Sequence, residues 1–232
     1  MCALDYWIHQ INKWEGQRQD WLSTFNFEPQ EEEIINYPMR EREIIRMEDG
    51  VPTVAKAHWG LVPPWAKDVK IGRQCYNARS ETITEKPAFR AAYKARRCLL
   101  VSTGYIEWAD LIEERENRKQ AVKFLVDGGQ RYACAGLWES WGDKENPYLS
   151  CSMLTCEPND LAGGVHSRMP VILNPDDYDA WLNLSSSPQD LLALLSPFPA
   201  ERMEMEYTTL PKGSRSATKV QDVEAISQSR LF

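Results

Sequence analysis

The order of hydrophobic and polar residues divides the chain into many short segments of strand character and fewer helical ones. Runs of apolar and β-branched residues predict strands, which we expect over 42–47, 53–61, 98–108, 149–155, 170–173 and 203–207. Two further β-rich runs within 120–137 are joined by the turn sequence Asp127-Gly128-Gly129-Gln130. This combination predicts a β-hairpin.

Helical spacing is less common along the chain. Apolar residues three and four positions apart predict an amphipathic helix within 5–25, and further helices are expected over 87–97, after Asn174-Pro175 and over 188–195. The acidic stretch 26–40 contains two prolines and is expected to be a loop. Many strands with few helices indicate an α+β fold, so we expect a single domain with a mainly antiparallel, curled, barrel-like β-sheet flanked by helices.

Length and composition suit a folded protein. The 232 residues fit one domain over 1–232, with the residues after about 210 as a C-terminal tail. Hydrophobic residues make up 43% of the chain, and no apolar run approaches the roughly 18 residues that span a bilayer. The N-terminus has no secretion signal, so we expect a cytoplasmic protein without a membrane partner. In that compartment thiols stay reduced, and five of the six cysteines are interpreted as buried small hydrophobic residues: Cys75, Cys98, Cys134, Cys151 and Cys156.

Three short stretches concentrate polar groups: 76–82, 104–108 and 163–170. In the second, Glu107 follows a long apolar run, and a carboxylate in apolar surroundings tends to have a raised pKa, which suits proton transfer near neutral pH. The alternative is that Glu107 faces outward and pairs with an arginine. In the third, His166 lies on a loop that begins with two glycines, where it is either a proton-transfer group or an ordinary surface histidine.

Metal and nucleotide sites have no support in the sequence. There is no CxxC or HExxH pattern, and neither glycine pair belongs to GxGxxG or a P-loop. We therefore predict no metal and no cofactor. The net charge of −7 argues mildly against nucleic acid as a partner, although local basic clusters such as Lys67, Lys70 and Arg73 are compatible with a basic strip.

Cys2 follows the initiator methionine, so removal of Met1 would expose one residue with both a thiol and an α-amine. The pKa of an α-amine lies near 7.7 to 8.0, against about 10.4 for lysine, so at neutral pH it is uncharged and nucleophilic roughly a few hundred times more often. An aldehyde that reacts with this amine can then receive the thiol at the same carbon, which closes a five-membered thiazolidine ring.

The motifs, taken in order, resemble the SOS-response-associated peptidase, or SRAP, family. They are the second-position cysteine, Trp-Gly-Leu-Val-Pro-Pro-Trp at 59–65, Asn-Ala-Arg-Ser-Glu at 77–81, Gly-Tyr-Ile-Glu-Trp at 104–108 and His-Ser-Arg-Met-Pro at 166–170. The resemblance extends from Cys2 to about Tyr207. The chain departs from the family pattern at Ala3 and Leu4, where glycine and arginine are usual, which removes one expected phosphate contact.

The resemblance implies a monomeric, nucleoid-associated protein that binds single-stranded DNA and forms a covalent crosslink with the ring-opened aldehyde of an abasic site. Cys2 would be the nucleophile, Asn77 would orient the sugar, and Glu107 and His166 would transfer protons. The residues implied to contact DNA are Arg79, Trp65, Trp108, Arg168 and Asn36, although both tryptophans would equally suit a hydrophobic core.

Two other functions remain open at this point. An N-terminal cysteine activated by His166 or Glu107 could make the protein a thiol peptidase or autoprotease, but no oxyanion-hole motif is visible. A non-catalytic module that binds single-stranded DNA through its tryptophans is the third possibility.

Overall fold

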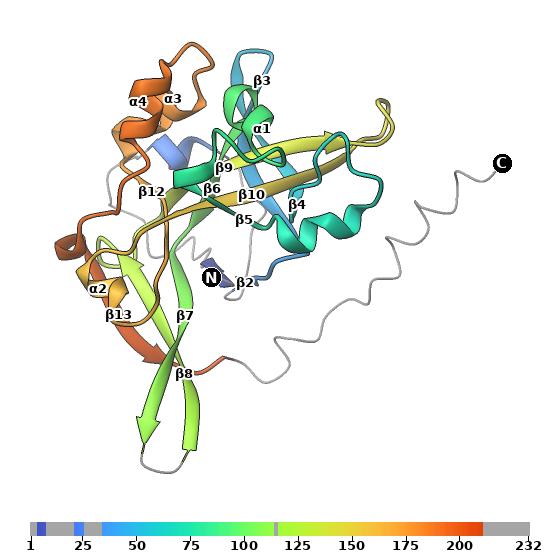
Figure 1. Cartoon of the computed structure of the whole chain (residues 1–232). Coiled ribbons are helices and arrows are strands. Elements are labelled where there is room, and N and C mark those ends of the chain that lie inside the picture. Colours follow the sequence, from blue (N-terminus) through green and yellow to red (C-terminus); the bar gives the residue numbers. More distant parts are fainter. Residues whose placement is uncertain (1–3, 8–20, 26–33, 114–115, 211–232) are drawn as a thin grey trace.

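Five strands close into a barrel in the order β3, β4, β10, β9 and β6, and β6 returns to β3 (Figure 1). The computed structural model describes residues 4–7, 21–25, 34–113 and 116–210. Neighbouring strands of the barrel are antiparallel except β4 and β10, which are parallel. The strands are β3 (Glu41–Glu48), β4 (Val51–Trp59), β6 (Arg97–Ser102), β9 (Tyr132–Trp141) and β10 (Tyr148–Cys156). The predicted α+β domain with a mainly antiparallel, barrel-like sheet is confirmed.

A second sheet of five strands has the order β13, β8, β7, β1 and β2. Its strands are β1 (Leu4–Trp7), β2 (Ile34–Asn36), β7 (Gly104–Glu113), β8 (Glu116–Val126) and β13 (Met203–Thr208). The hairpin of β7 and β8 extends well away from the barrel (Figure 1). Three short strands join the barrel sheet: β5 (Asn77–Arg79), β11 (Met169–Pro170) and β12 (Ile172–Leu173).

The chain passes directly from the barrel to the second sheet between β6 and β7. The sequence predicted one strand over 98–108, but this segment is divided at Thr103, which is buried. The hydroxyl of Ser102 donates to the carbonyl of Gly104 at 2.8 Å and closes the bend. Glu107 therefore lies on a strand whose beginning is fixed by the barrel.

The helices are short, and all of them except the one over Asp160–Gly163 lie at one end of the barrel (Figure 1). They are α1 (Arg90–Ala95), α2 (Asp160–Gly163), α3 (Tyr178–Leu182) and α4 (Pro188–Ala193), with 3-10 turns η2 (Trp21–Thr24), η3 (Val69–Gln74), η4 (Ser80–Thr82), η5 (Pro175–Asp177) and η6 (Ala200–Arg202). The buried guanidinium of Arg97 donates to the carbonyls of Tyr93, Trp181 and Asn183 and so holds the C-terminal ends of α1 and α3 on the barrel. Over the described ranges, none of these helices has the length and apolar character needed to cross a bilayer.

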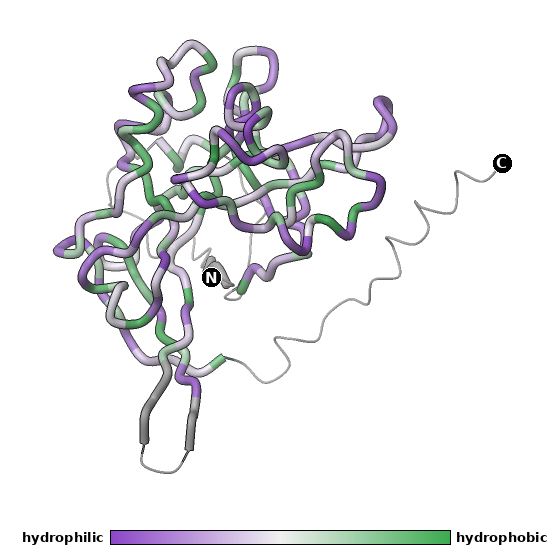
Figure 2. Tube along the Cα trace, viewed as in Figure 1, coloured by the Kyte–Doolittle hydropathy of each residue, from purple (hydrophilic) through white to green (hydrophobic). Residues whose placement is uncertain are grey.

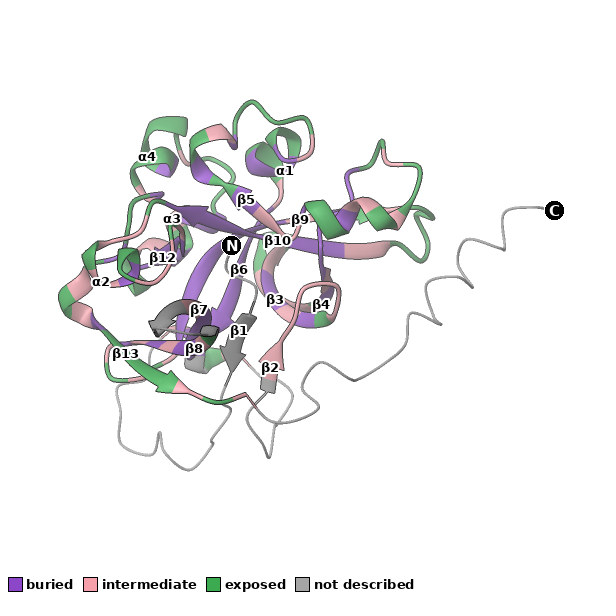
Figure 3. Ribbon diagram, turned by 60° about the horizontal axis from the view of Figure 1, so that its bottom comes forward, coloured by how far each residue is buried: buried purple, intermediate pink, exposed green. Residues whose placement is uncertain are grey.

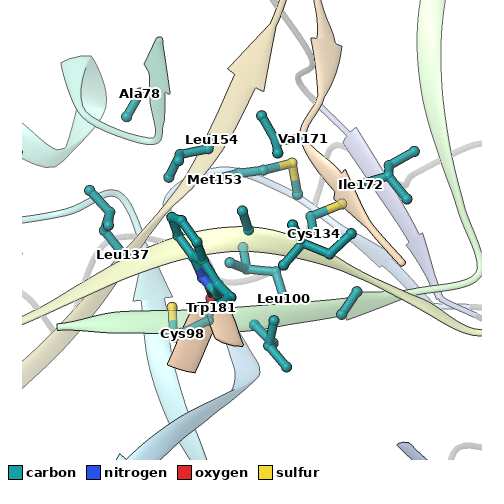
Figure 4. Close-up of a cluster of buried hydrophobic side chains, with 14 of the residues drawn as sticks. Ala78, Cys98, Leu100, Cys134, Leu137, Met153, Leu154, Val171, Ile172 and Trp181 are labelled. Carbon is teal, nitrogen blue, oxygen red and sulfur yellow. Dashed lines mark hydrogen bonds between the residues drawn. The ribbon is translucent and has the colours of Figure 1, made fainter. Parts of the chain in front are cut away.

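The hydrophobic core fills the barrel and continues beneath the helices. Purple, buried residues line β6, β9 and β10 in Figure 3, whereas the outer faces of α1 and α4 are exposed. The close-up in Figure 4 shows Trp181 from α3 among buried side chains of the barrel, and its indole N–H donates to the carbonyl of Cys98 at 2.9 Å. Hydrophilic residues gather at the turn between β9 and β10 (Figure 2), as expected for a loop that remains in water.

One prediction from the hydrophobic pattern is wrong. The runs within 120–137 form strands, but β8 pairs with β7 and β13, whereas β9 pairs with β6, β10 and β12. Three successive residues of the turn, Asp127, Gly128 and Gly129, have positive φ angles of 47°, 71° and 83°. This left-handed turn redirects the chain from one sheet to the other, and the ion pair between Asp127 and Arg202 holds it there.

The amphipathic helix expected within 5–25 is contradicted at the two ends of that range, and its middle is not tested. Residues 5–7 belong to β1, which lies between β2 and β7, and Trp21–Thr24 is a 3-10 turn; residues 8–20 lie outside the described part. Tyr and Trp favour strands when partners are present on both sides. The acidic stretch interpreted as a loop likewise contains β2.

Gly136 on β9 is a position where the barrel has no room for a side chain. A Cβ atom there would collide with Cδ1 of Leu100 and lie 3.0 Å from Sγ of Cys98 and 3.2 Å from the carbonyl oxygen of Ser152. Gly136→Ala is therefore expected to lower the free energy of unfolding by about 2 kcal/mol. Urea unfolding checks this value, with Gly163→Ala as control because its new Cβ would meet atoms no closer than 3.6 Å. Equal stability of the two variants would contradict the prediction.

Candidate active site

Glu107 is a buried carboxylate on β7 with 2% of its surface exposed. Alternation along the strand places Glu107 on the same face as Tyr105, which stacks on Phe124 in the core at a ring distance of 4.7 Å. Its cross-strand neighbour is Val122 on β8. The interpretation of Glu107 as an outward-facing residue is therefore wrong.

His166 lies against this carboxylate, with Nδ1 3.7 Å from Oε1 of Glu107. The imidazole is 22% exposed and the carboxylate 3% exposed, so the histidine is on the solvent side of the pair. The backbone N–H of Arg168 donates to His166 Nδ1 at 3.0 Å, and the carbonyl oxygen of Arg168 lies 3.1 Å from the same atom. A nitrogen that accepts a hydrogen bond carries no proton, so the contact with the Arg168 N–H corresponds to the tautomer with its proton on Nε2, and the contact with the Arg168 carbonyl to the tautomer with its proton on Nδ1.

The guanidinium of Arg168 is held by Glu81 and by β10. Its Nη1 lies 2.7 Å from Glu81 Oε1, and its Nη2 lies 2.9 Å from Glu81 Oε2. Nη2 also donates to the carbonyl of Thr155 at 2.6 Å. The hydrogen bond from Arg168 lowers the pKa of Glu81 below its ordinary value. Arg168 was predicted to contact DNA, and the structure shows that both of its terminal nitrogens already have protein acceptors.

Strand β1 brings the N-terminal end of the chain to Glu107. Leu4 pairs with Ile106, Asp5 with Tyr105 and Tyr6 with Gly104. Cys2 itself lies outside the described residues. Asn36, another predicted DNA contact, ends β2, is half-buried and pairs with Asp5 on the other side of β1.

Strand β5 carries the predicted sugar and phosphate contacts. Asn77 is half-buried and pairs with Met153 of β10, whereas Arg79 is exposed and pairs with Thr155. Thr155 also pairs with Pro170 of β11, which follows His166 and Arg168. The three polar stretches of the sequence therefore meet around one end of β10, where the two sheets approach each other.

The two predicted aromatic contacts differ in their surroundings. Trp65 follows β4, is 58% exposed, and its indole N–H donates to the carbonyl of Pro87 at 3.4 Å. Trp108 is half-buried and packs on Ile106 and Ala121 in a small second hydrophobic cluster. Trp65 is therefore largely accessible to a ligand, whereas part of the Trp108 side chain is buried in the small hydrophobic cluster.

The five cysteines within the described residues are buried, as predicted, and none of them forms a disulfide. Burial raises the pKa of the Cys75 thiol, raises that of Cys98 far above its ordinary value, and raises that of Cys156 to about 12. These thiols stay protonated at neutral pH and are poor nucleophiles. Among the described residues, no three acidic, histidine or cysteine side chains are grouped closely enough to hold a metal ion.

Chemically, the site combines a buried carboxylate, an imidazole on its solvent side and an amide and a guanidinium on a neighbouring strand. Such a set can transfer protons and bind a polar, anionic ligand. Sequence reasoning gave no role to Glu81 or Thr155. Glu81 lies in the Asn-Ala-Arg-Ser-Glu motif, which was the available signal, but its partner Arg168 is 87 residues away in the chain.

The chain is similar in sequence to known proteins. Abasic site processing protein YoaM of Bacillus subtilis is 42% identical over 153 residues, which cover 65% of this chain and 66% of YoaM. Abasic site processing protein HMCES of Xenopus tropicalis is 28% identical over 165 residues, which cover 62% of this chain and 49% of HMCES. The matched part is slightly less than two thirds of the length of YoaM and about half that of HMCES.

Solved structures share the fold. A crystal structure of a protein from Bacteroides thetaiotaomicron superimposes with a TM-score of 0.73 at 26% identity, covering 90% of this chain and 92% of the other. A protein from Bordetella bronchiseptica gives a TM-score of 0.70 at 24% identity, covering 90% of this chain and all of the other. The profile of the family described as SOS response associated peptidase (SRAP) matches residues 4–209, and the chain therefore belongs to the SRAP family.

Proposed function

We propose that this protein processes abasic sites in single-stranded DNA by linking Cys2 covalently to the aldehyde of the opened sugar. The observation that carries the proposal is the pair of Glu107 and His166 beside the start of β1. Leu4 pairs with Ile106, the residue before Glu107, and the two residue steps from Leu4 to Cys2 can span at most about 7 Å. The similarity to YoaM and HMCES, which are named abasic site processing proteins, supports the same substrate.

The proposed reaction begins when removal of Met1 exposes the α-amine of Cys2. The amine adds to the aldehyde carbon and forms a carbinolamine, whose hydroxyl leaves as water after it receives a proton. The thiol then adds to the resulting imine carbon, its proton moves to the nitrogen, and a thiazolidine ring is formed. No oxidant or reductant is required, because the aldehyde and the aminothiol combine with loss of one water.

Glu107 and His166 supply the proton transfers in this proposal. Glu107, which lies next to the residue that pairs with Leu4, protonates the departing hydroxyl and receives a proton in the reverse reaction. His166 is the more exposed member of the pair, and its Nε2–H can donate to the ring oxygen of the closed sugar as the aldehyde forms.

DNA binding is assigned to polar groups of β5, which pairs with the C-terminal half of β10, and to the tryptophans. Asn77 orients the sugar and the exposed Arg79 contacts a phosphate, while Trp65 offers a face for base stacking worth about 1 to 3 kcal/mol. Trp108 and Asn36 complete the proposed DNA contacts, whereas Arg168 is already bound to Glu81 and Thr155. All of these groups belong to one chain, so the proposal requires a single copy.

The test is an oligonucleotide with one abasic site, incubated with protein whose N-terminus has been verified as Cys2 by intact-mass measurement. We expect a heat-stable adduct whose mass equals protein plus DNA minus one water. The matched control is the same oligonucleotide with a tetrahydrofuran abasic analogue, which has no aldehyde and should give no adduct. Absence of an adduct with the aldehyde-bearing DNA would overturn the proposal.

A thiol peptidase is the second candidate, and the description of the matched family favours it. Because the described cysteines are buried, Cys2 would be its nucleophile as well. Cleavage of a peptide that requires Cys2 and proceeds without DNA would support this function. Tight DNA binding that is indifferent to Cys2, with neither adduct nor cleavage, would instead indicate a non-catalytic binding module.

A further inference from the structure

Glu81 is connected to His166 and Glu107 through Arg168, whose side chain binds Glu81 and whose backbone N–H donates to His166. We propose that Glu81 is a positioning residue that sets the orientation and tautomer of His166 by fixing Arg168. The inference rests on the proposed function for its catalytic consequence, whereas its structural part concerns the free protein alone.

The main chain at Arg168 is held from both sides. On one side, Met169 and Pro170 form β11 and pair with Cys156 and Thr155 of β10. On the other, the Arg168 side chain binds the Glu81 carboxylate at two points and the Thr155 carbonyl at a third. The peptide N–H and carbonyl that both approach His166 Nδ1 are therefore fixed in space by these contacts.

The two-point geometry is what makes Glu81 suitable for this role. A guanidinium and a carboxylate that share two parallel hydrogen bonds are held in one plane, which a single contact does not achieve. The Arg168 side chain is 13% exposed and the Glu81 side chain 44% exposed, so the carboxylate lies on the outer side of the cation. Without Glu81, a largely buried cation would keep only Thr155 and would turn toward solvent.

Two groups of the Arg168 main chain lie beside Nδ1, and they favour different tautomers of the ring. The N–H at 3.0 Å donates to an Nδ1 without a proton, and the carbonyl at 3.1 Å accepts from an Nδ1 with a proton. A small displacement of this main chain therefore changes which tautomer is favoured. This property depends on the position of the Arg168 backbone, which we assign to Glu81.

The experiment records the tautomer of His166 by 15N NMR of the three histidines, with the His166 signals assigned from a His166→Gln spectrum. In wild type we expect the neutral ring to carry its proton on Nε2. In Glu81→Ala we expect a mixture of both tautomers and a fall of about tenfold in the rate of adduct formation. Arg168→Lys keeps the positive charge but loses the two-point contact, and should behave in the same way. Glu85→Ala, an exposed glutamate four residues further on, is the matched control and should resemble wild type in both measurements.

The outcomes separate this inference from the proposed function. If the His166 tautomer in both folded variants equals that of wild type, Glu81 does not position the ring and the inference is wrong. If the tautomer changes while wild-type protein forms no adduct, the positioning role stands and the proposed function fails. Urea unfolding establishes that each variant is folded, and Glu81→Gln, which keeps one acceptor, should give an intermediate tautomer ratio.

Discussion

Cys2→Ala is expected to lower the yield of heat-stable adduct at least about a hundredfold. The variant keeps an α-amine, so it can still form an imine with the aldehyde, but the imine is hydrolysed readily by water. In wild type the thiol of the same residue traps the imine, and ring closure has the advantage of an intramolecular reaction, worth an effective molarity of about 10⁵ M or more. Denaturing electrophoresis of the heated mixture, with the N-terminus verified by mass, measures the difference.

Two additional measurements separate loss of the Cys2 thiol from loss of the amine, of DNA binding or of another thiol. Borohydride reduces imines, so it should restore a stable link between Cys2→Ala and the abasic oligonucleotide, which would show that the amine and DNA binding are intact. Cys156→Ala removes a buried thiol close to Arg168 and should form adduct like wild type. Burial raises the pKa of the Cys156 thiol to about 12, so this thiol is not a nucleophile at neutral pH. A heat-stable adduct from Cys2→Ala without borohydride would contradict the thiazolidine mechanism.

The fold was predictable where local pattern and tertiary pairing agree. Strands β3, β4, β10 and β13 lie close to the segments expected from their apolar and β-branched residues. The pattern identifies a strand but not its partner, and this is why the segment 120–137 was assigned to one hairpin. The positive φ angles at Asp127–Gly129 fit a tight turn in either arrangement, and only the packing of β8 on β13 decides between them.

The candidate site shows the same division between local and distant information. The sequence singled out Glu107 and His166 as members of separate polar stretches, and the structure places them 3.7 Å apart although 59 positions separate them in the chain. The contact depends on β7 leaving the barrel at Thr103 and on β11 pairing with β10, and neither event leaves a local signal. Glu81 was missed for the same reason, because an exposed glutamate acquires a role only from its distant partner.

Glu107→Gln is expected to slow adduct formation by about a hundredfold while the protein stays folded. Glutamine has nearly the shape of glutamate and fills the same space between Tyr105 and the strand β8, but its amide neither gives nor takes a proton at neutral pH. General acid and base catalysis typically contributes 10² to 10⁴ in rate, and the lower figure applies here because His166 remains beside the reacting groups. Single-turnover kinetics with an excess of protein over abasic oligonucleotide measures the rate of the chemical step directly.

The matched control for this variant is Glu139→Gln, because Glu139, on the barrel strand β9, is also a glutamate with 2% exposure. Its carboxylate accepts from Arg96 at 2.7 Å, and burial raises its pKa above the ordinary value, so the exchange also removes a buried charge from the core. We expect this variant to lose stability but to form adduct within about twofold of the wild-type rate, provided the assay is run well below its unfolding temperature. If Glu107→Gln were no slower than Glu139→Gln, the carboxylate beside β1 would have no part in the chemistry, and His166 alone would have to supply the proton transfers.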